Sequence, residues 1–471
     1  MGEPWSMTLG ELAGAVASRR IAGPAGTRAA GVSIDSRSIR PGDLFVAIRG
    51  ARFDGHRFVG DAVARGAAAV LVSDAAALGA PPAPGIVVDD TLHALQALAR
   101  RVRRDSGARV VAVTGSVGKT TTKELSAALL ETRYRVFRNR GNLNNHIGLP
   151  LSLLELRTRP EVAVVELGMS GPGEIRRLVE IAEPDVRVWT NVGEAHAEFF
   201  PSIEAIADAK AEILTGASRD AVVVANAADD RVMCRVAGFP GRVVTFGVDV
   251  EAEVSASGVE DLGLDGVRAR LRTPVGASPV RTRLLGRGNL ANVLAAVGVA
   301  LSFDVPLAAA VERAAAVEAP PHRGRIHRLA GGVAVIDDSY NSSPLALETA
   351  LATLARGGAG RRVAVLGEML ELGARAEDLH RAAGRAAAAA GVGLLLTVGG
   401  EPVRALGRAA VEAGAPAAGV LHCETAEEAA SRAAASVRDG DVVLVKGSRG
   451  VRTDRVVTRL CADRPAGSER T

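Results

Sequence analysis

The sequence has few cysteines and no long run of apolar residues. Its three cysteines, Cys234, Cys423 and Cys461, are far apart and form neither a disulfide framework nor a CxxC metal motif, which fits a reducing compartment. No uncharged apolar run reaches the ~18 residues that a membrane-spanning helix needs, and the first residues lack the basic and apolar regions of a signal peptide. We therefore expect a cytoplasmic protein without membrane insertion.

An excess of positive charge is also lacking. The 57 Lys and Arg residues are nearly balanced by 53 Asp and Glu, so the net charge is only +4 over 471 residues. Nine Phe, two Tyr and two Trp offer few stacking surfaces for single-stranded nucleic acid. The composition therefore argues against nucleic acid as a partner. Apolar residues make up 48% and charged residues 23%, as in globular enzymes, and the length predicts about three domains of ~150 residues each.

Lysine is nearly absent. Of the 57 basic residues only four are lysine (Lys119, Lys123, Lys210 and Lys446), and the other 53 are arginine. A surface cation can be either residue, but a compact or deprotonatable amine cannot be replaced by a guanidinium group. Each remaining lysine is therefore a candidate for a role that needs an amine.

The pattern of apolar residues predicts an α/β protein with three domains at residues 1–107, 108–321 and 322–471, called the first, central and third blocks below. In the first block, a small α/β domain, short strands are expected at residues 31–34, 44–48, 68–72 and 85–88. The central and third blocks carry continuous apolar strands separated by helices, as in parallel sheets buried on both faces. These strands are expected at 110–113, 162–165, 186–189, 222–224, 243–246, 333–336, 363–366, 394–398, 419–421 and 442–445. Residues 250–285 alternate and predict a β-rich insertion.

A glycine-rich turn follows the strand at 110–113 and precedes a helix. Such a turn presents backbone N–H groups to phosphates at the positive end of the helix, with Lys119 on the outer phosphates and Thr120 on Mg²⁺. The turn departs from the usual GxxxxGK[ST] spacing because Val113 occupies the first glycine position. The pattern predicts an ATP site formed by Gly115, Ser116, Val117, Gly118, Lys119, Thr120 and Thr121.

Two further positions are candidate metal ligands. Glu166 ends the strand at 162–165, where a carboxylate beside the phosphate turn can bind Mg²⁺, although a solvated glutamate is the plainer interpretation. Lys210 falls in the middle of a helical stripe of isoleucine and leucine. Burial drives a lysine toward its neutral form, and a neutral amine can capture carbon dioxide as a carbamate, which offers oxygen ligands to Mg²⁺. The alternative is an ammonium group that reaches solvent along the helix surface.

The motifs resemble those of the bacterial Mur ligases in all three blocks. Residues 114–121 (TGSVGKTT) match the phosphate loop shared by that family, whose variant accounts for the missing first glycine. The first block carries DSR at 35–37, FVA at 45–47 and DGHRF at 54–58. The stretches GNLNNHIG at 141–148, GEMLELG at 367–373 and KGSR at 446–449 are similar to the branch that adds D-alanyl-D-alanine.

The resemblance implies a role for each site residue. Thr120 and Glu166 would hold one Mg²⁺, and His196 with carbamylated Lys210 a second. Asn289 and Asn292 would contact adenine, Arg325 the γ-phosphate and Asp338 the ribose; otherwise Arg325 would be a linker cation and Asp338 a helix cap. Lys119, Lys210, His196 and Arg325 would be catalytic. The residues implied to bind the substrates are Ser36, Arg37, Asn142, Asn144, Asn145, Tyr340, Asn341 and Lys446.

The resemblance also implies the reaction, the ATP-dependent ligation of D-alanyl-D-alanine to UDP-N-acetylmuramoyl-tripeptide in the cytoplasmic stage of peptidoglycan synthesis. It implies ATP and Mg²⁺ as cofactors, a uridine-nucleotide-binding first block and a Rossmann-like third block, and we expect a monomer. Three alternatives remain at this point: a sister ligase with another amino-acid substrate, a nucleic-acid-stimulated P-loop ATPase, and a binding module without catalysis.

Overall fold

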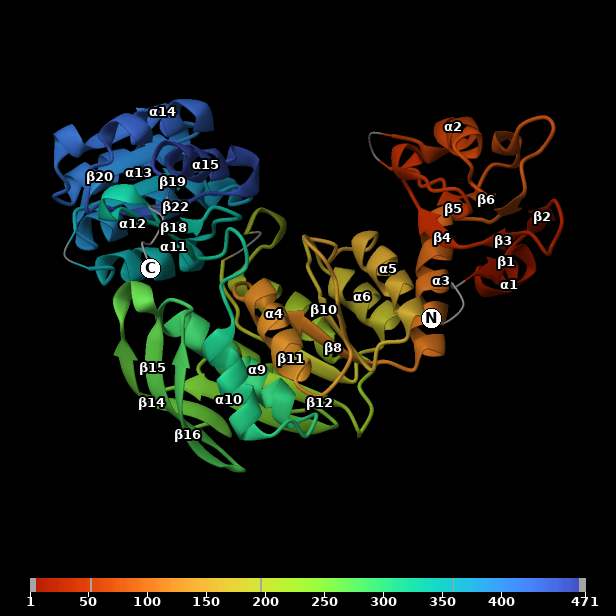
Figure 1. Ribbon diagram of the computed structural model, residues 1–471, viewed down its shortest axis with the longest axis horizontal. Helices are drawn as coiled ribbons and strands as arrows, with labels where there is room; N and C mark the ends of the chain where they lie inside the picture. Colours follow the sequence, from red (N-terminus) through yellow and green to blue (C-terminus); the bar gives the residue numbers. More distant parts are fainter. Residues whose placement is uncertain (1–5, 51–52, 195–196, 359, 466–471) are drawn as a thin grey trace. The chain divides into compact units, whose positions relative to one another are not determined.

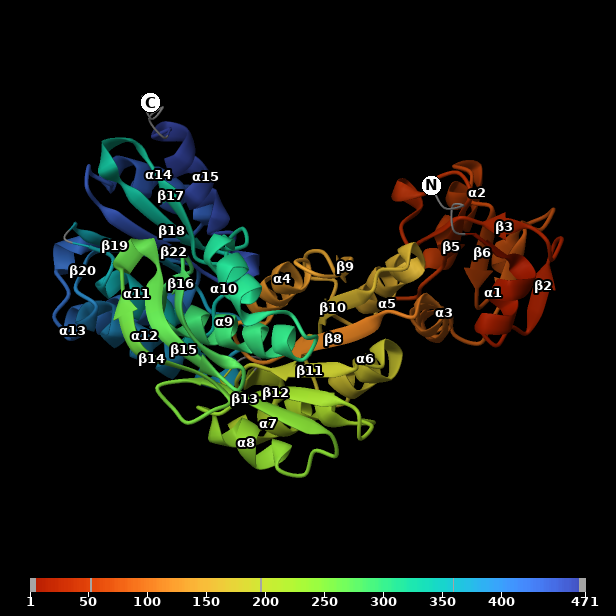
Figure 2. The same ribbon diagram turned by 60° about the horizontal axis from the view of Figure 1, so that its bottom comes forward.

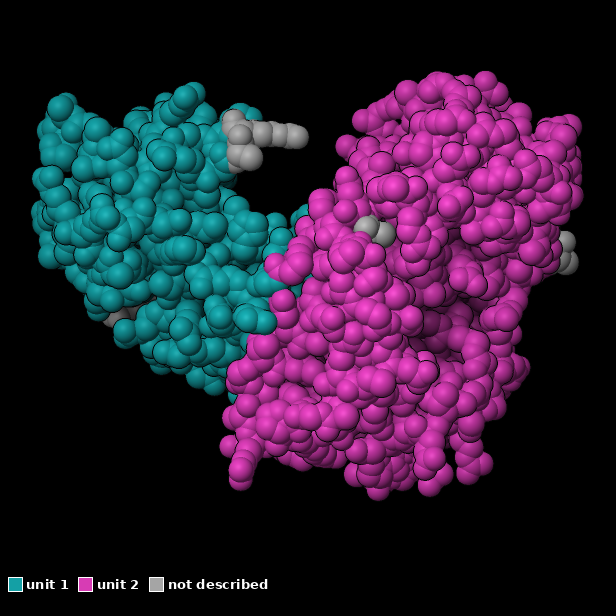
Figure 3. All heavy atoms as spheres, turned by 180° about the vertical axis from the view of Figure 1, so that it is seen from behind, with its two compact units in different colours: residues 1–112, 134–169, 173–185 teal, residues 113–133, 170–172, 186–471 magenta. Residues whose placement is uncertain are grey.

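The computed structural model describes residues 6–50, 53–194, 197–358 and 360–465. The chain divides into two compact units, shown in two colours in Figure 3. The first unit consists of residues 1–112, 134–169 and 173–185, and the second of residues 113–133, 170–172 and 186–471. Within the described ranges, no helix has the length and apolar character needed to cross a membrane.

The first unit begins with a five-stranded sheet in the order β2-β7-β6-β5-β4. Strands β4 to β7 are parallel, and β2 is antiparallel to β7 at one edge. All residues of β5, β6 and β7 are buried, which explains their continuous apolar sequence. The strands are β1 Met7–Thr8, β2 Arg20–Ala22, β3 Arg28–Ala29, β4 Gly31–Ser33, β5 Asp43–Val46, β6 Ala69–Val72 and β7 Gly85–Val87, and the helices are α1 Leu9–Ala15, α2 Val59–Ala64 and α3 Thr91–Ser106.

A nine-stranded sheet follows in the order β16-β15-β14-β13-β12-β11-β8-β10-β9. Strands β11 to β14 are parallel, whereas β14, β15 and β16 are antiparallel and form the expected β-rich segment. The strands are β8 Arg109–Thr114, β9 Val136–Arg138, β10 Val162–Glu166, β11 Val186–Trp189, β12 Val222–Asn226, β13 Arg242–Val248, β14 Val254–Asp261, β15 Val267–Thr273 and β16 Gly276–Thr282. The accompanying helices are α4 Lys119–Leu130, α5 Gly148–Leu153, α6 Glu174–Ala182, α7 Ile203–Ala211, α8 Asp230–Val236, α9 Gly286–Leu301 and α10 Leu307–Ala316.

The third block is a six-stranded sheet in the order β17-β18-β22-β19-β20-β21, with helices on both sides (Figures 1 and 2). Only the edge strand β17 is antiparallel to its neighbour among the described strands of this sheet. The strands are β17 Arg325–Arg328, β18 Ala334–Asp338, β19 Arg362–Gly367, β20 Val392–Val398, β21 Val420–Cys423 and β22 Val442–Lys446, and the helices are α11 Pro344–Ala355, α12 Ala376–Ala389, α13 Glu401–Glu412, α14 Ala426–Ser436 and α15 Asp454–Asp463.

Side chains of β19 alternate between two apolar cores. Ala364 and Leu366 pack with α11, α12 and α13, and Val363 and Val365 pack with α14 and α15. This arrangement confirms the α/β fold class and the doubly wound third block. Strands β9 and β17 were not predicted because both are short, half-exposed edge strands without a continuous apolar run.

The core of the third block gives a first prediction. Leu406 of α13 is fully buried, whereas Val411 of the same helix is exposed. Leu406→Ala is expected to lower the free energy of unfolding of this block by about 2–5 kcal/mol, because it removes contacts and leaves a cavity. Val411→Ala is the control and is expected to cost less than about 1 kcal/mol. Urea unfolding of the full chain, followed by circular dichroism, measures both, and equal shifts would contradict the assignment of Leu406 to the core.

Candidate active site

The glycine-rich turn lies between β8 and α4, as predicted. Gly118 precedes the first turn of α4 with φ of 87°, and a Cβ at this position would collide with the side-chain amide of Asn292. Gly118, the N-cap of α4, has no side chain to cap this helix end, and backbone N–H groups at such an end point toward a site where a phosphate can bind. The amine of Lys119 bends back over the turn and donates to the carbonyl oxygens of Gly115 at 2.8 Å and Ser116 at 3.2 Å.

The segment after β11 holds the turn in place. The Asn191 side chain accepts from Val117 N–H at 2.9 Å and donates to Val117 O at 3.0 Å. The Ser116 hydroxyl accepts from Gly193 N–H at 2.8 Å and donates to Gly193 O at 2.9 Å. We call residues 190–193 the clamp segment. Sequence reasoning did not assign a role to Asn191 or Gly193; the only signal was the asparagine at the end of a buried strand.

A second support comes from α9. Asn292 accepts from the Thr122 hydroxyl at 3.2 Å and donates to Asn289 Oδ1 at 3.0 Å, while Asn289 donates to Leu285 O at 2.9 Å. Asn292 thus ties α9 to the first turns of α4, and Asn289 holds the Asn292 amide in place. If Asn289 and Asn292 contact adenine as predicted, the same side-chain amides would bind the base and also keep these hydrogen bonds.

Lys210 lies on the buried face of α7. Its side chain is 2% exposed, among fully buried neighbours that include Ile206 and Ile213. Burial and the nearby positive charge of Lys119 move the pKa of Lys210 well below its usual value. The burial argues against the alternative of an ammonium group that reaches solvent.

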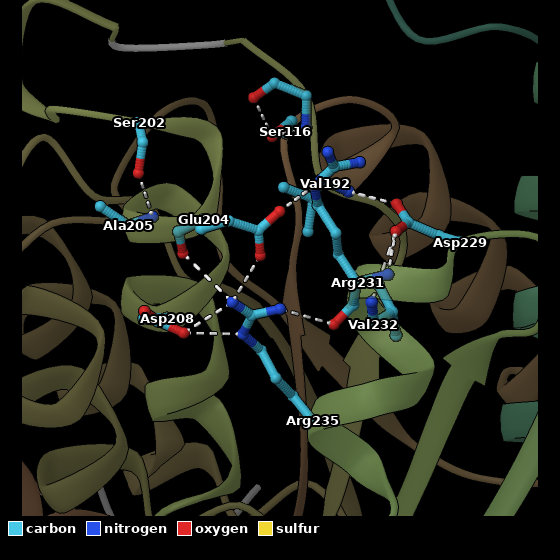
Figure 4. A network of polar contacts seen from close by, with 11 residues as sticks. Ser116, Val192, Ser202, Glu204, Ala205, Asp208, Asp229, Arg231, Val232 and Arg235 are labelled. Carbon is cyan, nitrogen blue, oxygen red and sulfur yellow. Dashed lines mark hydrogen bonds and ion pairs between the residues drawn. The ribbon is translucent and has the colours of Figure 1, made fainter.

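The opposite face of α7 is fixed by ion pairs to α8 (Figure 4). Arg235 contacts Asp208 at 2.7 Å and Glu204 at 2.9 Å, and Arg231 contacts Glu204 at 2.7 Å. These hydrogen bonds lower the pKa of Glu204. Asp229, which caps α8, also accepts from Val192 N–H in the clamp segment at 2.7 Å. Ion pairs on the exposed face therefore orient the helix so that Lys210 points inward. The predicted ligand His196 lies outside the described residues.

In the first unit, Glu166 ends β10 as predicted and is 3% exposed. One of its carboxylate oxygens accepts from Asn144 Nδ2 at 2.9 Å, and its backbone N–H donates to Asn139 Oδ1 at 3.1 Å. The GNLNN stretch thus orients this carboxylate. Asn145 Oδ1 accepts from the N–H groups of Ile147 at 3.2 Å and Gly148 at 2.8 Å, at the start of α5.

The remaining first-unit candidates lie at the surface or in turns. Asn142 is exposed, and Ser36 is buried in a short 3₁₀-helix next to the exposed Arg37. A hydrogen bond from Arg37 lowers the pKa of Asp35 to about 2. In the DGHRF stretch, His56 Nε2 accepts from Ser73 N–H at 2.9 Å, so its Nδ1 donates to Asp54.

The structure brings three third-block candidates together. The amine of Lys446, 3% exposed, donates to Asp338 Oδ2 at 2.6 Å and to Asn341 O at 3.0 Å. The Tyr340 ring lies under the guanidinium group of Arg323, 4.1 Å from its centroid. This cluster lies at the carboxyl ends of β18 and β22, the usual location of ligand sites in parallel sheets.

The linker that enters the third block is fixed to β18. Asp337 accepts from His322 Nδ1 at 2.9 Å, and the carbonyl of Asp337 accepts from Gly324 N–H at 2.9 Å. Arg325 then begins β17, opposite Asp337, with its side chain half-exposed and 3.6 Å from Glu318. Arg325 is therefore held by the third block.

A phosphate turn between a parallel strand and a helix, in a chain of α/β sheets, defines a nucleotide-binding protein of the P-loop type. Three family models match this chain. They describe the Mur ligase family catalytic domain at residues 28–103, the Mur ligase middle domain at residues 113–300 and the Mur ligase glutamate ligase domain at residues 322–449.

Relatives and solved structures agree with these models. The chain is 36% identical to the UDP-N-acetylmuramoyl-tripeptide–D-alanyl-D-alanine ligase of Escherichia coli and 33% identical to that of Bacillus subtilis, each over 91% of this chain and 93% of the relative. A crystal structure of MurF from Acinetobacter baumannii superposes with a TM-score of 0.87 at 30% identity, over 98% of this chain and 100% of that one. The structure of MurF from Thermotoga maritima in complex with ADP superposes with a TM-score of 0.81 at 30% identity, over 92% of this chain and 97% of that one. The chain belongs to the Mur ligase family.

The clamp segment gives a second prediction. Asn191→Ala removes two hydrogen bonds to Val117, so that its N–H loses the Asn191 acceptor while its carbonyl keeps the Thr190 hydroxyl at 2.7 Å. We expect the affinity for Mg²⁺-ADP to fall about 5- to 30-fold, measured by isothermal titration calorimetry.

The matched control is Ser202→Ala. This substitution removes the hydrogen bond by which the Ser202 hydroxyl accepts from Ala205 N–H and caps α7. The hydrogen bond lies at the start of α7 and not at the phosphate turn. It is expected to lower stability by about 1 kcal/mol without changing the affinity. Equal affinities in wild type and Asn191→Ala would show that the clamp does not shape the phosphate site.

Proposed function

We propose that this chain is the ligase that joins D-alanyl-D-alanine to UDP-N-acetylmuramoyl-tripeptide with hydrolysis of ATP, in the cytoplasmic stage of peptidoglycan synthesis. The observation that carries the proposal is a likeness over the whole chain to relatives that bear this name. A diaminopimelate-adding ligase covers 97% of this chain at only 20% identity and a TM-score of 0.56, and shares the fold alone.

The reaction that follows has two steps. A carboxylate is a poor acylating agent. A terminal carboxylate oxygen of the tripeptide therefore attacks the γ-phosphorus of ATP and forms an acyl phosphate. The bond from the γ-phosphorus to the bridging oxygen breaks, and ADP leaves with its electron pair. The amine nitrogen of the dipeptide then attacks the acyl carbon and forms a tetrahedral intermediate. The amine loses a proton and phosphate leaves, which forms the amide.

The residues of this chain supply charge and position. The amine of Lys119 and the N–H groups at the start of α4 stabilise the transferring phosphoryl group. We propose that Arg325 adds a second cation at the γ-phosphate and that Asp338 binds the ribose. Because Lys446 is ion-paired with Asp338, the pair would act together at the third-block site. Tyr340 and Asn341 lie beside it as candidate substrate contacts.

Magnesium fits the side chains that would hold it. Glu166 offers a buried, oriented carboxylate, Thr120 a hydroxyl at the start of α4, and carbamylated Lys210 would add oxygens from α7. His196 stays a predicted ligand. When bound, Mg²⁺ would neutralise charge on the phosphates and polarise the P–O bonds.

For the tripeptide nucleotide, we propose binding at the first unit by Ser36 and Arg37 and at the exposed loop of Asn142. Asn144 and Asn145 would contribute by holding that loop against Glu166 and α5. Asn289 and Asn292 would form the adenine side of the ATP site while bracing α4. We propose a monomer that binds no nucleic acid.

The third prediction tests the function directly. Purified protein is expected to release phosphate only with ATP, Mg²⁺, UDP-N-acetylmuramoyl-tripeptide and D-alanyl-D-alanine all present, because the acyl phosphate turns over only when an amine attacks it. A coupled phosphate assay with mass spectrometry of the product measures it. Equal turnover with a single amino acid would indicate a sister ligase, and stimulation by DNA or RNA would reject this class.

The fourth prediction concerns Lys210. Lys210→Ala and Lys210→Arg are expected to lower kcat by about 10²-fold or more, because neither side chain can form a carbamate that binds metal. Short carboxylic acids should partly restore Lys210→Ala by filling the cavity. In ¹³C NMR after equilibration with labelled bicarbonate, wild type should show a carbamate resonance that Lys210→Arg lacks.

Lys123 provides the control for this assignment. It is equally buried, but its amine pairs with the carboxylate of Glu124 at 2.9 Å and lies in a different helix from the proposed carbamate. Lys123→Arg should therefore keep the resonance. Full activity of Lys210→Arg, or an unmodified Lys210 in active enzyme, would contradict the carbamate.

A further inference from the structure

One end of the clamp segment contacts the third block. Glu194 directly follows Gly193, and its carboxylate pairs with the guanidinium group of Arg375 at 2.6 Å. A Cβ on Gly193 would lie 2.9 Å from Leu345 in the first turn of α11 and 3.6 Å from Ser116. Gly193 is thus packed between the third block and the phosphate turn.

A second contact joins the same two regions. Glu198 N–H, in the short helix η5 Ala197–Phe199, donates to the carbonyl of Glu371 at 3.0 Å. Glu371 has φ of 63° and Gly373 has φ of 54°, and a Cβ on Gly373 would lie 3.2 Å from Glu198 Cα. A glutamate in the left-handed region is strained, and such strain persists only where surrounding contacts hold it. The GEMLELG loop is therefore shaped to approach this segment closely.

We propose that Arg375 and Glu194 are positioning residues for the ATP site. The ion pair anchors the end of the clamp segment, whose backbone and side chains hold Ser116 and Val117 of the phosphate turn. Docking of the third block against Glu194 then sets the shape of the turn, and nucleotide affinity depends on a contact that never touches the nucleotide. The inference rests on the proposed function only in taking ATP as the ligand.

The test is a charge exchange. The single variants Arg375→Glu and Glu194→Arg each place like charges together and should weaken Mg²⁺-ADP binding about three- to tenfold by calorimetry, the size expected for a partly exposed pair turned repulsive. The double variant should return to within about twofold of wild type, because the opposite charges face each other again. In the ligase assay, the single variants should raise KM for ATP more than they lower kcat.

The matched control is the pair Arg381–Glu412, which joins α12 to α13 at 2.6 Å within the third block. Arg381→Glu should leave ADP affinity unchanged, while a general effect of losing one ion pair would appear in both series. Arg375→Ala is the milder variant if charge reversal prevents folding, which circular dichroism would show, and it should weaken binding about two- to threefold.

Two outcomes would overturn the inference: wild-type ADP affinity in folded Arg375→Glu, or a loss that the double variant does not recover. Failure of the proposed function would give a different result. In that case the wild-type protein would bind ADP but form no amide from the tripeptide nucleotide and the dipeptide. The calorimetry of the Arg375 and Glu194 variants would still show whether the ion pair affects ADP affinity.

Discussion

The hydrogen bonds between Asn191 and Val117 fix the phosphate turn to the segment that follows β11. A phosphate turn is a length of backbone whose N–H groups must all point inward, and nothing within such a turn prevents it from relaxing. Here the end of β11 supplies that restraint through a side-chain amide that satisfies both backbone groups of Val117. The same segment accepts the Ser116 hydroxyl and donates Val192 N–H to Asp229, so α8 and the turn share one support. Preorganised donors of this kind stabilise a phosphoryl group without the cost of rearranging during the reaction.

The scarcity of lysine in the sequence agrees with where the four lysines lie in the structure. Lys123, Lys210 and Lys446 are 1%, 2% and 3% exposed, and Lys119 bends over the phosphate turn. In a chain that uses arginine at its surface, lysine remains where the side chain is enclosed. The three buried amines differ in their partners. Lys123 pairs with Glu124 and Lys446 with Asp338, whereas the charge that acts on Lys210 is the positive one of Lys119. Burial and the nearby charge of Lys119 lower the pKa of Lys210 and favour the neutral amine that carbamate formation requires.

Sequence could predict the strands that are buried on both faces, because a short continuous apolar run between helical segments is typical of a parallel sheet covered on both sides. It could also predict the phosphate turn, since strand, glycines, lysine and helix occur together within a few residues. It could not predict the pairing of Asp338 with Lys446, which are 108 positions apart, or the contact of Asn292 with Thr122, 170 positions apart. Such pairs depend on which strands and helices become neighbours in the fold, and the pattern of residues in a single sequence does not indicate which elements will be adjacent. The edge strands β9 and β17 were missed for a related reason: their contacts on one side only leave no apolar pattern.

The linker into the third block gives Arg325 a defined place. Asp337 is 2% exposed, and its carboxylate is satisfied by His322 from the linker and by the neighbouring Ser339. Removing one partner of a buried charge costs more than the hydrogen bond itself gains, so this contact resists separation of the linker from β18. Arg325 therefore moves with the third block, as does Arg375 at the far side of the GEMLELG loop. Arg325, the proposed cation at the γ-phosphate, and Arg375, the proposed anchor of the phosphate turn, thus both belong to the third block. The two proposals together link nucleotide binding in the second unit to the block that carries Lys446 and its neighbours.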